Sequence, residues 1–103
     1  MSVGTPEREL PFKLYQNYPN PFDQRTVFKF DLFSNAHVEL EVFNLLGEKV
    51  ADIVSRSLNS GTHEIEWKRT TALPSGAYIY KLKVRPLNSD QIFELQRQMV
   101  ILD

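Results

Sequence analysis

The stretch Val38-Glu39-Leu40-Glu41-Val42-Phe43 decides the fold, because apolar and charged side chains alternate there more clearly than elsewhere in the chain. A period of two is typical of a β-strand with one face in a hydrophobic core and the other in water. We therefore expect Val38, Leu40 and Val42 to point inward and the two glutamates to face solvent.

The same alternation recurs on both sides of this strand, and turn signals such as Asn59-Ser60-Gly61 and Pro74-Ser75-Gly76 separate the segments. Six or seven short strands without a convincing helix predict an all-β fold, an antiparallel sandwich. The alternating sets are Phe12, Leu14 and Gln16; Phe28, Phe30 and Leu32; His63, Ile65 and Trp67; Tyr78, Tyr80, Leu82 and Val84; and Phe93, Leu95, Arg97, Met99 and Ile101. The expected core contains Phe30, Val38, Leu40, Val42, Ile65, Trp67, Tyr78, Tyr80 and Leu82.

Residues 48–58 allow two interpretations. Helical spacing fits the apolar residues Leu46, Val50, Ile53, Val54 and Leu58 better than alternation does. However, the segment is short, lies between two strong strands and is rich in β-branched residues. We interpret it as a bulged strand, partly because of the family resemblance described below.

The length of 103 residues fits one domain with a single core. Residues 1–11 are polar and contain two prolines, so we expect a linker or a cloning remnant there, followed by one domain over residues 12–103. No segment approaches the ~20 apolar residues of a membrane helix, so membrane insertion is not expected. The first residues lack the features of a signal peptide, so any export signal is expected on a larger precursor.

Charge is unevenly distributed along the chain. The net charge is −1, which argues against nucleic-acid binding. Residues 1–67 hold six Lys or Arg against ten Asp or Glu, net −4, whereas residues 68–103 hold six against three, net +3. The basic stripe Lys81, Lys83 and Arg85 on one strand face is therefore the best candidate for partner contact. An alternative is that these residues pair with Glu39 and Glu41 on a neighbouring strand.

No combination of side chains indicates catalysis. Glu64 and Glu66, like Glu39 and Glu41, share a strand face, but no third ligand or base accompanies either pair. The two histidines lack metal-ligand neighbours, and the chain has no cysteine. We expect no catalytic residue, no metal and no cofactor, and hence no enzyme.

An aromatic platform for sugars is a rival possibility. Tyr15, Tyr18 and Trp67 are its candidate residues. Trp67 alternates in phase with Ile65, which favours core packing instead.

Four segments carry recognisable motifs: Gln16-Asn17-Tyr18-Pro19-Asn20-Pro21-Phe22; Val38 to Val50 with its Gly-x-x-Val end; Ser60-Gly61-Thr62-His63 with Trp67; and Leu73-Pro74-Ser75-Gly76-Ala77-Tyr78-Ile79-Tyr80-Lys81-Leu82. Together they resemble the C-terminal sorting domains of proteins exported by the bacterial type IX secretion system. Their order also matches, and the resemblance covers residues 14–102.

The resemblance implies an immunoglobulin-like sandwich of about seven strands that the secretion machinery reads. The sequence departs from the family pattern in two places. The family usually continues Asn-Pro-x-Thr after its phenylalanine, whereas this chain has Asp23-Gln24-Arg25-Thr26 and lacks the third proline. The usual lysine pair before the last apolar run is here Arg97-Gln98. The family-motif residues are Asn17, Pro19, Asn20, Pro21, Phe22, Gly47, Gly61, Trp67, Ser75, Gly76 and Tyr78. The expected recognition residues are Lys81, Lys83, Arg85, Arg97, Gln98, Met99, Val100, Ile101 and Leu102.

The resulting hypothesis is a non-catalytic sorting and surface-attachment signal. Its expected partners are an outer-membrane component of the secretion machinery and a cargo domain that precedes it covalently, and the domain itself is expected to be a monomer. The expected location is the periplasm in transit, then the cell surface or the medium. The alternatives are a structural immunoglobulin-like module, either of the flagellar hook-cap type or beside a secreted hydrolase, and a carbohydrate-binding module.

Overall fold

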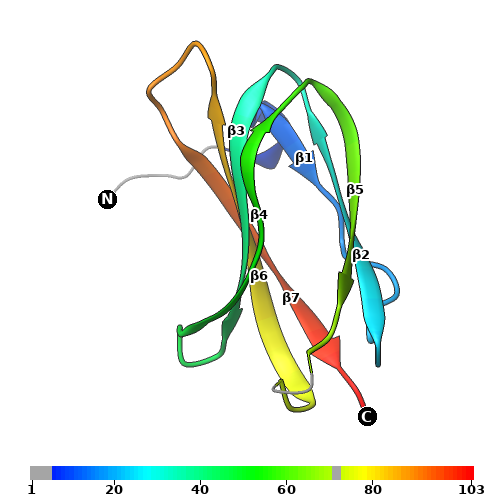
Figure 1. Ribbon diagram of the computed structural model, residues 1–103. Coiled ribbons are helices and arrows are strands. Elements are labelled where there is room, and N and C mark those ends of the chain that lie inside the picture. Colours follow the sequence, from blue (N-terminus) through cyan, green and yellow to red (C-terminus); the bar gives the residue numbers. More distant parts are fainter. Residues whose placement is uncertain (1–5, 71–72) are drawn as a thin grey trace.

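A computed structural model describes residues 6–70 and 73–103 of the chain. One short 3₁₀-helix precedes seven strands in the described residues (Figure 1). The elements are η1 Glu7–Glu9, β1 Phe12–Leu14, β2 Arg25–Leu32, β3 Ala36–Asn44, β4 Lys49–Leu58, β5 Gly61–Lys68, β6 Gly76–Pro86 and β7 Phe93–Ile101.

The strands form two antiparallel sheets that face each other (Figure 1). One sheet has the strand order β1-β2-β5, and the other has the order β4-β3-β6-β7. The edge strands of the two sheets lie in pairs: β5 lies beside β4 on one side of the sandwich, and β1 lies beside β7 on the other, where Arg97 bonds Leu14 O. This arrangement confirms the predicted all-β, immunoglobulin-like antiparallel sandwich.

The side chains at every second position of the strands point inward and fill the space between the sheets. Val38, Leu40 and Val42 are fully buried, as predicted, and so are Tyr80 and Leu82 on the neighbouring strand β6. Each such side chain contributes about 1.5–3 kcal/mol of transfer free energy. The two β5 residues expected in the core, Ile65 and Trp67, are partly buried and pack against its margin.

Strand β4 confirms the choice of strand over helix for this region. Its pairing with β3 shifts register twice, between Leu40 and Glu41 and between Val42 and Phe43. Each irregularity changes the alternation of side chains between the sheet faces. The disturbed period explains why Val50, Ile53 and Val54, which all lie partly buried against the core, resemble a helical pattern in the sequence.

Contacts with the sandwich extend to residues that precede Phe12. Leu10 lies in the core with 7% of its surface exposed, and Glu7 forms an ion pair with Arg97 on β7 at 3.0 Å. The main-chain oxygen of Pro11 accepts a hydrogen bond from Phe33. Hydrophobic burial of one side chain and these two polar contacts hold residues 7–11 against the sandwich.

Among the helical residues that the structure describes, no run is long and apolar enough to cross a membrane.

Candidate functional site: the proline-rich loop, the final strand and the outer sheet face

The proline-rich segment 16–22 is hydrogen-bonded to the final strand. The main-chain N–H of Phe22 donates to Val100 O at 3.1 Å, and the N–H of Leu102 donates to Phe22 O at 2.8 Å. The Asn20 side-chain oxygen accepts from the N–H of Val100 at 2.9 Å. The peptide bonds before Pro19 and Pro21 are cis. The loop therefore occupies the outer edge of β7 at its C-terminal end, where an exposed edge could otherwise pair with another chain.

Asn17 organises this loop from inside the protein. It is 1% exposed, and its side-chain amide donates to Thr26 Oγ1 at 3.0 Å and to Pro19 O at 3.3 Å. Its main-chain N–H donates to the Tyr80 hydroxyl at 2.9 Å. Because the side-chain amide and the main-chain N–H both have partners, burial of this asparagine avoids the cost of leaving these groups unsatisfied.

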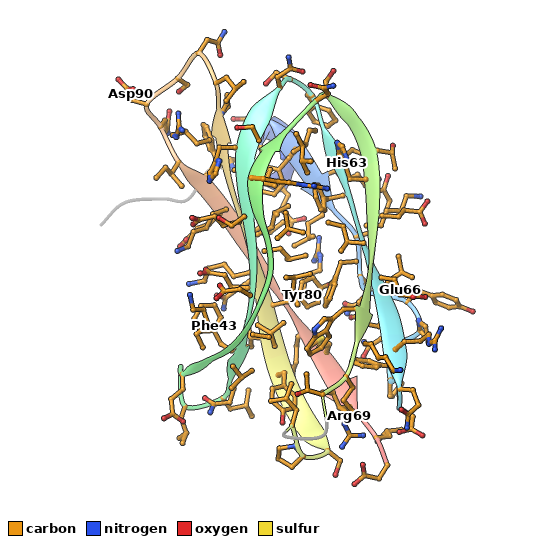
Figure 2. All side chains as sticks on the ribbon, in the orientation of Figure 1. Phe43, His63, Glu66, Arg69, Tyr80 and Asp90 are labelled. Carbon is orange, nitrogen blue, oxygen red and sulfur yellow. The ribbon has the colours of Figure 1, made fainter. Side chains whose placement is uncertain are left out.

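Tyr80 joins the loop to the centre of the four-stranded sheet. Figure 2 shows its ring between the two sheets, where it lies 4.9 Å from the Phe28 ring. Its hydroxyl donates to Tyr15 O at 2.8 Å while accepting from Asn17. Burial raises the pKa of Tyr80 above its ordinary value, and the hydrogen bond from Asn17 and the charge of Arg97 oppose that shift.

Arg69 holds the end of the chain that follows β7 (Figure 2). Its guanidinium bonds Leu102 O at 3.2 Å and the Asp103 carboxylate at 2.7 Å, and it also contacts Asp23 at 3.4 Å. The hydrogen bond from Arg69 is the main reason why the pKa of Asp103 is lowered. Our sequence analysis missed Arg69, because a single arginine outside an alternating segment carries no pattern.

The remaining motif residues shape turns and core edges. Gly47, Gly61 and Gly76 have φ values of +87°, +127° and +147°, which residues with a Cβ rarely adopt. The Tyr78 hydroxyl donates to Pro74 O at 2.6 Å, and Ser75 contributes a hydrogen bond that helps lower the pKa of Asp103. The Trp67 ring packs against Phe22 and Phe28, with centroids 6.2 and 6.0 Å apart.

The expected recognition residues do not share one surface. Arg97 points inward and its guanidinium bonds Leu14 O at 2.9 Å, and the side chains of Met99 and Ile101 are fully buried. These three side chains therefore offer little to a partner that meets the folded domain. The expected recognition residues that point outward from the four-stranded sheet are Lys81, Lys83 and Arg85 on β6 and Gln98 and Val100 on β7. Leu102 follows β7 with 51% of its surface exposed.

The sequence allowed the basic stripe Lys81, Lys83 and Arg85 either to contact a partner or to pair with Glu39 and Glu41, and its three residues differ in this respect. Lys83 lies opposite Glu39 in the ladder, and its Nζ is 3.4 Å from Glu41 Oε1. The other Glu41 oxygen pairs with Lys49 Nζ at 3.3 Å, and the acidic partners Asp52 and Glu41 raise the pKa of Lys49. Glu41 Oε1 is buried without a well-aligned hydrogen bond, so the Lys83 contact is ionic.

The other two residues of the stripe differ from Lys83. Lys81 Nζ lies 5.1 Å from the centroid of the Phe43 ring, which Figure 2 shows on the outer side of this sheet. Arg85 forms no ion pair with any residue that the structure describes. Positive charge therefore remains available at the Arg85 end of β6.

The residues considered for catalysis or metal binding lie apart. His63 stacks on Phe30 and its Nε2 is 2.7 Å from Asn59 O, whereas His37 lies 4.0 Å from Glu39 on the other sheet. Glu66 points to solvent from β5 (Figure 2) and pairs with Arg25 at 3.8 Å. Within residues 6–70 and 73–103, no three His, Cys, Asp or Glu side chains form a group that could hold a metal ion.

The aromatic candidates for sugar binding occupy different faces. Trp67 packs toward the core, as described above. Tyr15 lies with Lys13 and Lys29 on the outer side of the three-stranded sheet, where its hydroxyl donates to Asp31 at 2.7 Å. Tyr18 is 80% exposed in the proline-rich loop. The three rings therefore do not form the single flat surface that a sugar-binding platform needs.

Comparisons with known proteins match this geometry to one solved structure and one family. The dimeric latent PorU from Porphyromonas gingivalis resembles the chain with a TM-score of 0.70 and 18% identity. That match covers 90% of this chain and 10% of the PorU chain, so it supports the fold alone. A search of curated protein sequences found no match. The model of the family described as "Secretion system C-terminal sorting domain" matches residues 16–94. Since this match spans most of the chain, the protein belongs to the family of type IX secretion C-terminal sorting domains.

Proposed function

We propose that this domain is a non-catalytic docking module, and that the secretion machinery contacts the outer face of its four-stranded sheet. A sorting signal of this family directs export to the cell surface or the extracellular space. The partner that we propose is an outer-membrane component of the machinery, which a monomeric domain meets from the periplasm while still attached to its cargo.

One observation carries the choice of face. Lys81, Lys83 and Arg85 point outward from β6, and Gln98 and Val100 point outward from the adjacent strand β7. The same face thus combines the basic stripe with the exposed half of the final strand. Complementary charge speeds encounter and selects partners, which is what a domain that must be recognised in transit requires.

Export of a reporter tests the sorting role. A reporter with a periplasmic signal peptide, joined ahead of residues 1–103, is expressed in a bacterium that has a type IX system. We expect the fusion to reach the surface or the medium. A fusion that folds but remains in the periplasm would contradict the proposed role and favour the structural immunoglobulin-like module.

A double charge reversal tests the recognition face separately. Lys81→Glu with Arg85→Glu leaves the ion pair of Lys83 with Glu41 in place. It removes the Lys81 contact to Phe43, worth about 0.5–1 kcal/mol at an exposed site, and it places a carboxylate opposite Glu41 in the ladder, so the stability of this variant is measured as well. We expect export to fall at least about tenfold, a loss of about 1.4 kcal/mol of recognition free energy. Arg56→Glu with Lys68→Glu changes charge equally at the opposite edges of the sheets and should be exported like the parent.

The two variants also separate the possible outcomes. If the parent fusion is exported and the Lys81/Arg85 variant is exported equally well, the sorting role stands and the proposed face is wrong. Thermal unfolding of both variants shows whether each is folded before its export is compared. Light scattering of the purified chain tests the monomer, and a mass twice that of the chain would contradict it.

A further inference from the structure

The turn between β3 and β4 exposes two neighbouring leucines, which we call the leucine tip. Leu45 is 63% exposed and Leu46 is 86% exposed. Figure 1 shows this turn bending away from the three-stranded sheet. Neither leucine packs against the hydrophobic core, so the fold does not account for them. Large apolar side chains side by side on a protein surface are typical of a contact with another molecule.

Asn44 gives the turn one defined shape. Its side-chain oxygen accepts hydrogen bonds from the N–H groups of Leu46 and Glu48 at 2.9 and 3.0 Å. Its side-chain amide donates to Glu48 Oε1 at 2.8 Å, and its main-chain N–H donates to Glu48 O at 2.9 Å. Its main-chain oxygen accepts from the N–H of Gly47 at 3.1 Å. The leucine tip is therefore ordered before any partner binds, which lowers the entropic cost of binding.

The same hydrogen bonds prepare the leucine tip for burial. The N–H groups of three consecutive residues, Leu46, Gly47 and Glu48, all have acceptors within the turn. A main-chain donor that enters an apolar environment without an acceptor carries a large desolvation penalty, which these three donors avoid. An apolar site can therefore enclose the tip without supplying hydrogen bonds to them.

The leucine tip continues an apolar end of the outer sheet face. Phe43 comes just before the turn, and Figure 2 shows it on the outer side of the sheet. Ile79 lies opposite Phe43 in the ladder and therefore shares that side. Ala77, two residues away on β6, lies opposite Val100. Because Lys81 lies over the Phe43 ring, this apolar end meets the outer face that we propose for recognition.

The charged groups beside the leucine tip already have partners. Glu48 accepts a hydrogen bond from the Asn44 side chain. Lys49 forms ion pairs with Glu41 at 3.3 Å and with Asp52 at 3.0 Å. Since these groups are satisfied within the domain, they contribute little to a contact at the tip. Such a contact is apolar, and salt should weaken it little.

Neither a lipid bilayer nor a second copy of the chain suits the leucine tip. Residues 45–48 contain no Trp or Tyr, which are enriched at membrane interfaces, and no cation to attract anionic lipids. A single myristoyl chain binds membranes only marginally, and two leucine side chains bury fewer carbon atoms than such a chain. Contact between the tips of two copies would fall far short of the roughly 1,200 Å² that a stable interface buries.

We propose that the leucine tip inserts into an apolar pocket of the protein component of the secretion machinery that contacts the outer sheet face. This inference rests on the proposed function and adds the chemistry of the partner, a pocket with room for two branched aliphatic side chains beside a surface that meets the basic stripe. Leu45 and Leu46 anchor the domain in the pocket, while Lys81 and Arg85 guide the encounter.

Export of two variants tests the leucine tip. In the reporter fusion, Leu45→Ser with Leu46→Ser should lower export at least about tenfold, because two apolar anchors are lost. Phe33→Ser with Leu87→Ser is the matched control, since these residues are 64% and 52% exposed. They follow β2 and β6 at the opposite end of the sandwich (Figure 1), so the control should be exported like the parent. Thermal unfolding shows that each variant is folded before its export is compared.

The export results separate this inference from the proposed function. If the parent fusion stays in the periplasm, the proposed function fails and the inference fails with it. If the parent is exported and the leucine variant is exported equally well, the sorting role stands and the pocket is wrong. A loss of export in the leucine variant alone, with the control unaffected, is the expected result.

Binding to membranes tests the occupant. The fluorescently labelled chain is titrated with outer-membrane fragments from a bacterium with a type IX system, with fragments from the same bacterium lacking that system, and with vesicles of lipids extracted from these membranes. We expect saturable binding to the first alone, and at least about tenfold weaker binding of the leucine variant at low and at high salt. Equal binding to either of the other two preparations would overturn the proposal. A dimer in light scattering that the leucine variant abolishes would also overturn it.

Discussion

The side-chain oxygen of Asn20 accepts a hydrogen bond from the main-chain N–H of Val100 at 2.9 Å, across 80 residues of sequence. Phe22 adds two main-chain hydrogen bonds beside it. The family motif near the start of the domain therefore acts on the final strand, whose inward side chains Met99 and Ile101 are fully buried. In the folded domain the tail is accessible only through its outward residues.

Replacement of Asn20 should loosen the end of β7 locally. In Asn20→Ala, the Val100 amide loses its acceptor, and a hydrogen bond of this kind contributes about 0.5–1.5 kcal/mol. We expect hydrogen exchange at Val100 to accelerate by up to about tenfold, with little change at Leu40. Asn20→Asp retains an acceptor oxygen and should restore most of the protection. Equal acceleration in both variants would contradict this role for the side-chain oxygen.

Truncation of Leu40 should destabilise the whole domain. The side chain is fully buried at the centre of β3, and Leu→Ala changes in cores cost about 2–5 kcal/mol of unfolding free energy. Leu46 is 86% exposed in the β3–β4 turn, so Leu46→Ala should cost less than about 0.5 kcal/mol. Denaturant unfolding of both variants measures the difference. Similar losses at the two positions would show that the inward face of β3 is wrong.

The Glu41–Lys49 pair should contribute modestly and should depend on salt. Lys49 is 44% exposed and Glu41 is 12% exposed, so solvent screens much of their attraction at 3.3 Å. A double-mutant cycle with Glu41→Gln and Lys49→Met should give a coupling of about 0.2–1 kcal/mol that falls at high salt. A coupling that is unchanged at high salt would contradict an ionic contact at the sheet surface.

Alkaline pH should destabilise the domain through Tyr80. Burial raises the folded pKa of Tyr80 above its ordinary value of 10.0. Below pH 10 the hydroxyl is neutral in the folded and the unfolded state, so Tyr80 contributes its full share to the free energy of unfolding. As the pH rises above 10.0, the unfolded chain ionises first, and stability falls until the pH passes the folded pKa.

The Tyr80→Phe variant checks this pH dependence. It loses the hydrogen bonds to Tyr15 and Asn17, so it should be less stable at neutral pH, but its stability should decline less steeply above pH 10. Urea unfolding at several alkaline pH values measures both effects. Tyr18→Phe, at an exposed position, serves as the control. An alkaline decline as steep as that of the parent would assign the effect to other groups.

Much of the fold could be predicted from the sequence, because alternation determines which face of a strand is buried. Val38, Leu40 and Val42 are inside as their spacing indicates, and Lys83 lies outside beside Glu41. The resemblance of the four motifs to a family of sorting domains is likewise confirmed by the family match. Local periodicity was weakest at β4, where the shifts in register with β3 disturb it.

The candidate site was only partly accessible to sequence analysis, because its contacts join distant segments. Alternation already placed Arg97, Met99 and Ile101 on one face, but only the sheet order β4-β3-β6-β7 shows that this face meets the core and that β7 is an edge strand. The packed residues before Phe12 and the contacts of Arg69 with the chain end follow no local pattern. The sequence by itself determined the strands and their inward residues. Tertiary structure decided which edges are closed, which charges are paired and which parts of the tail remain exposed, since these depend on which distant segments come together.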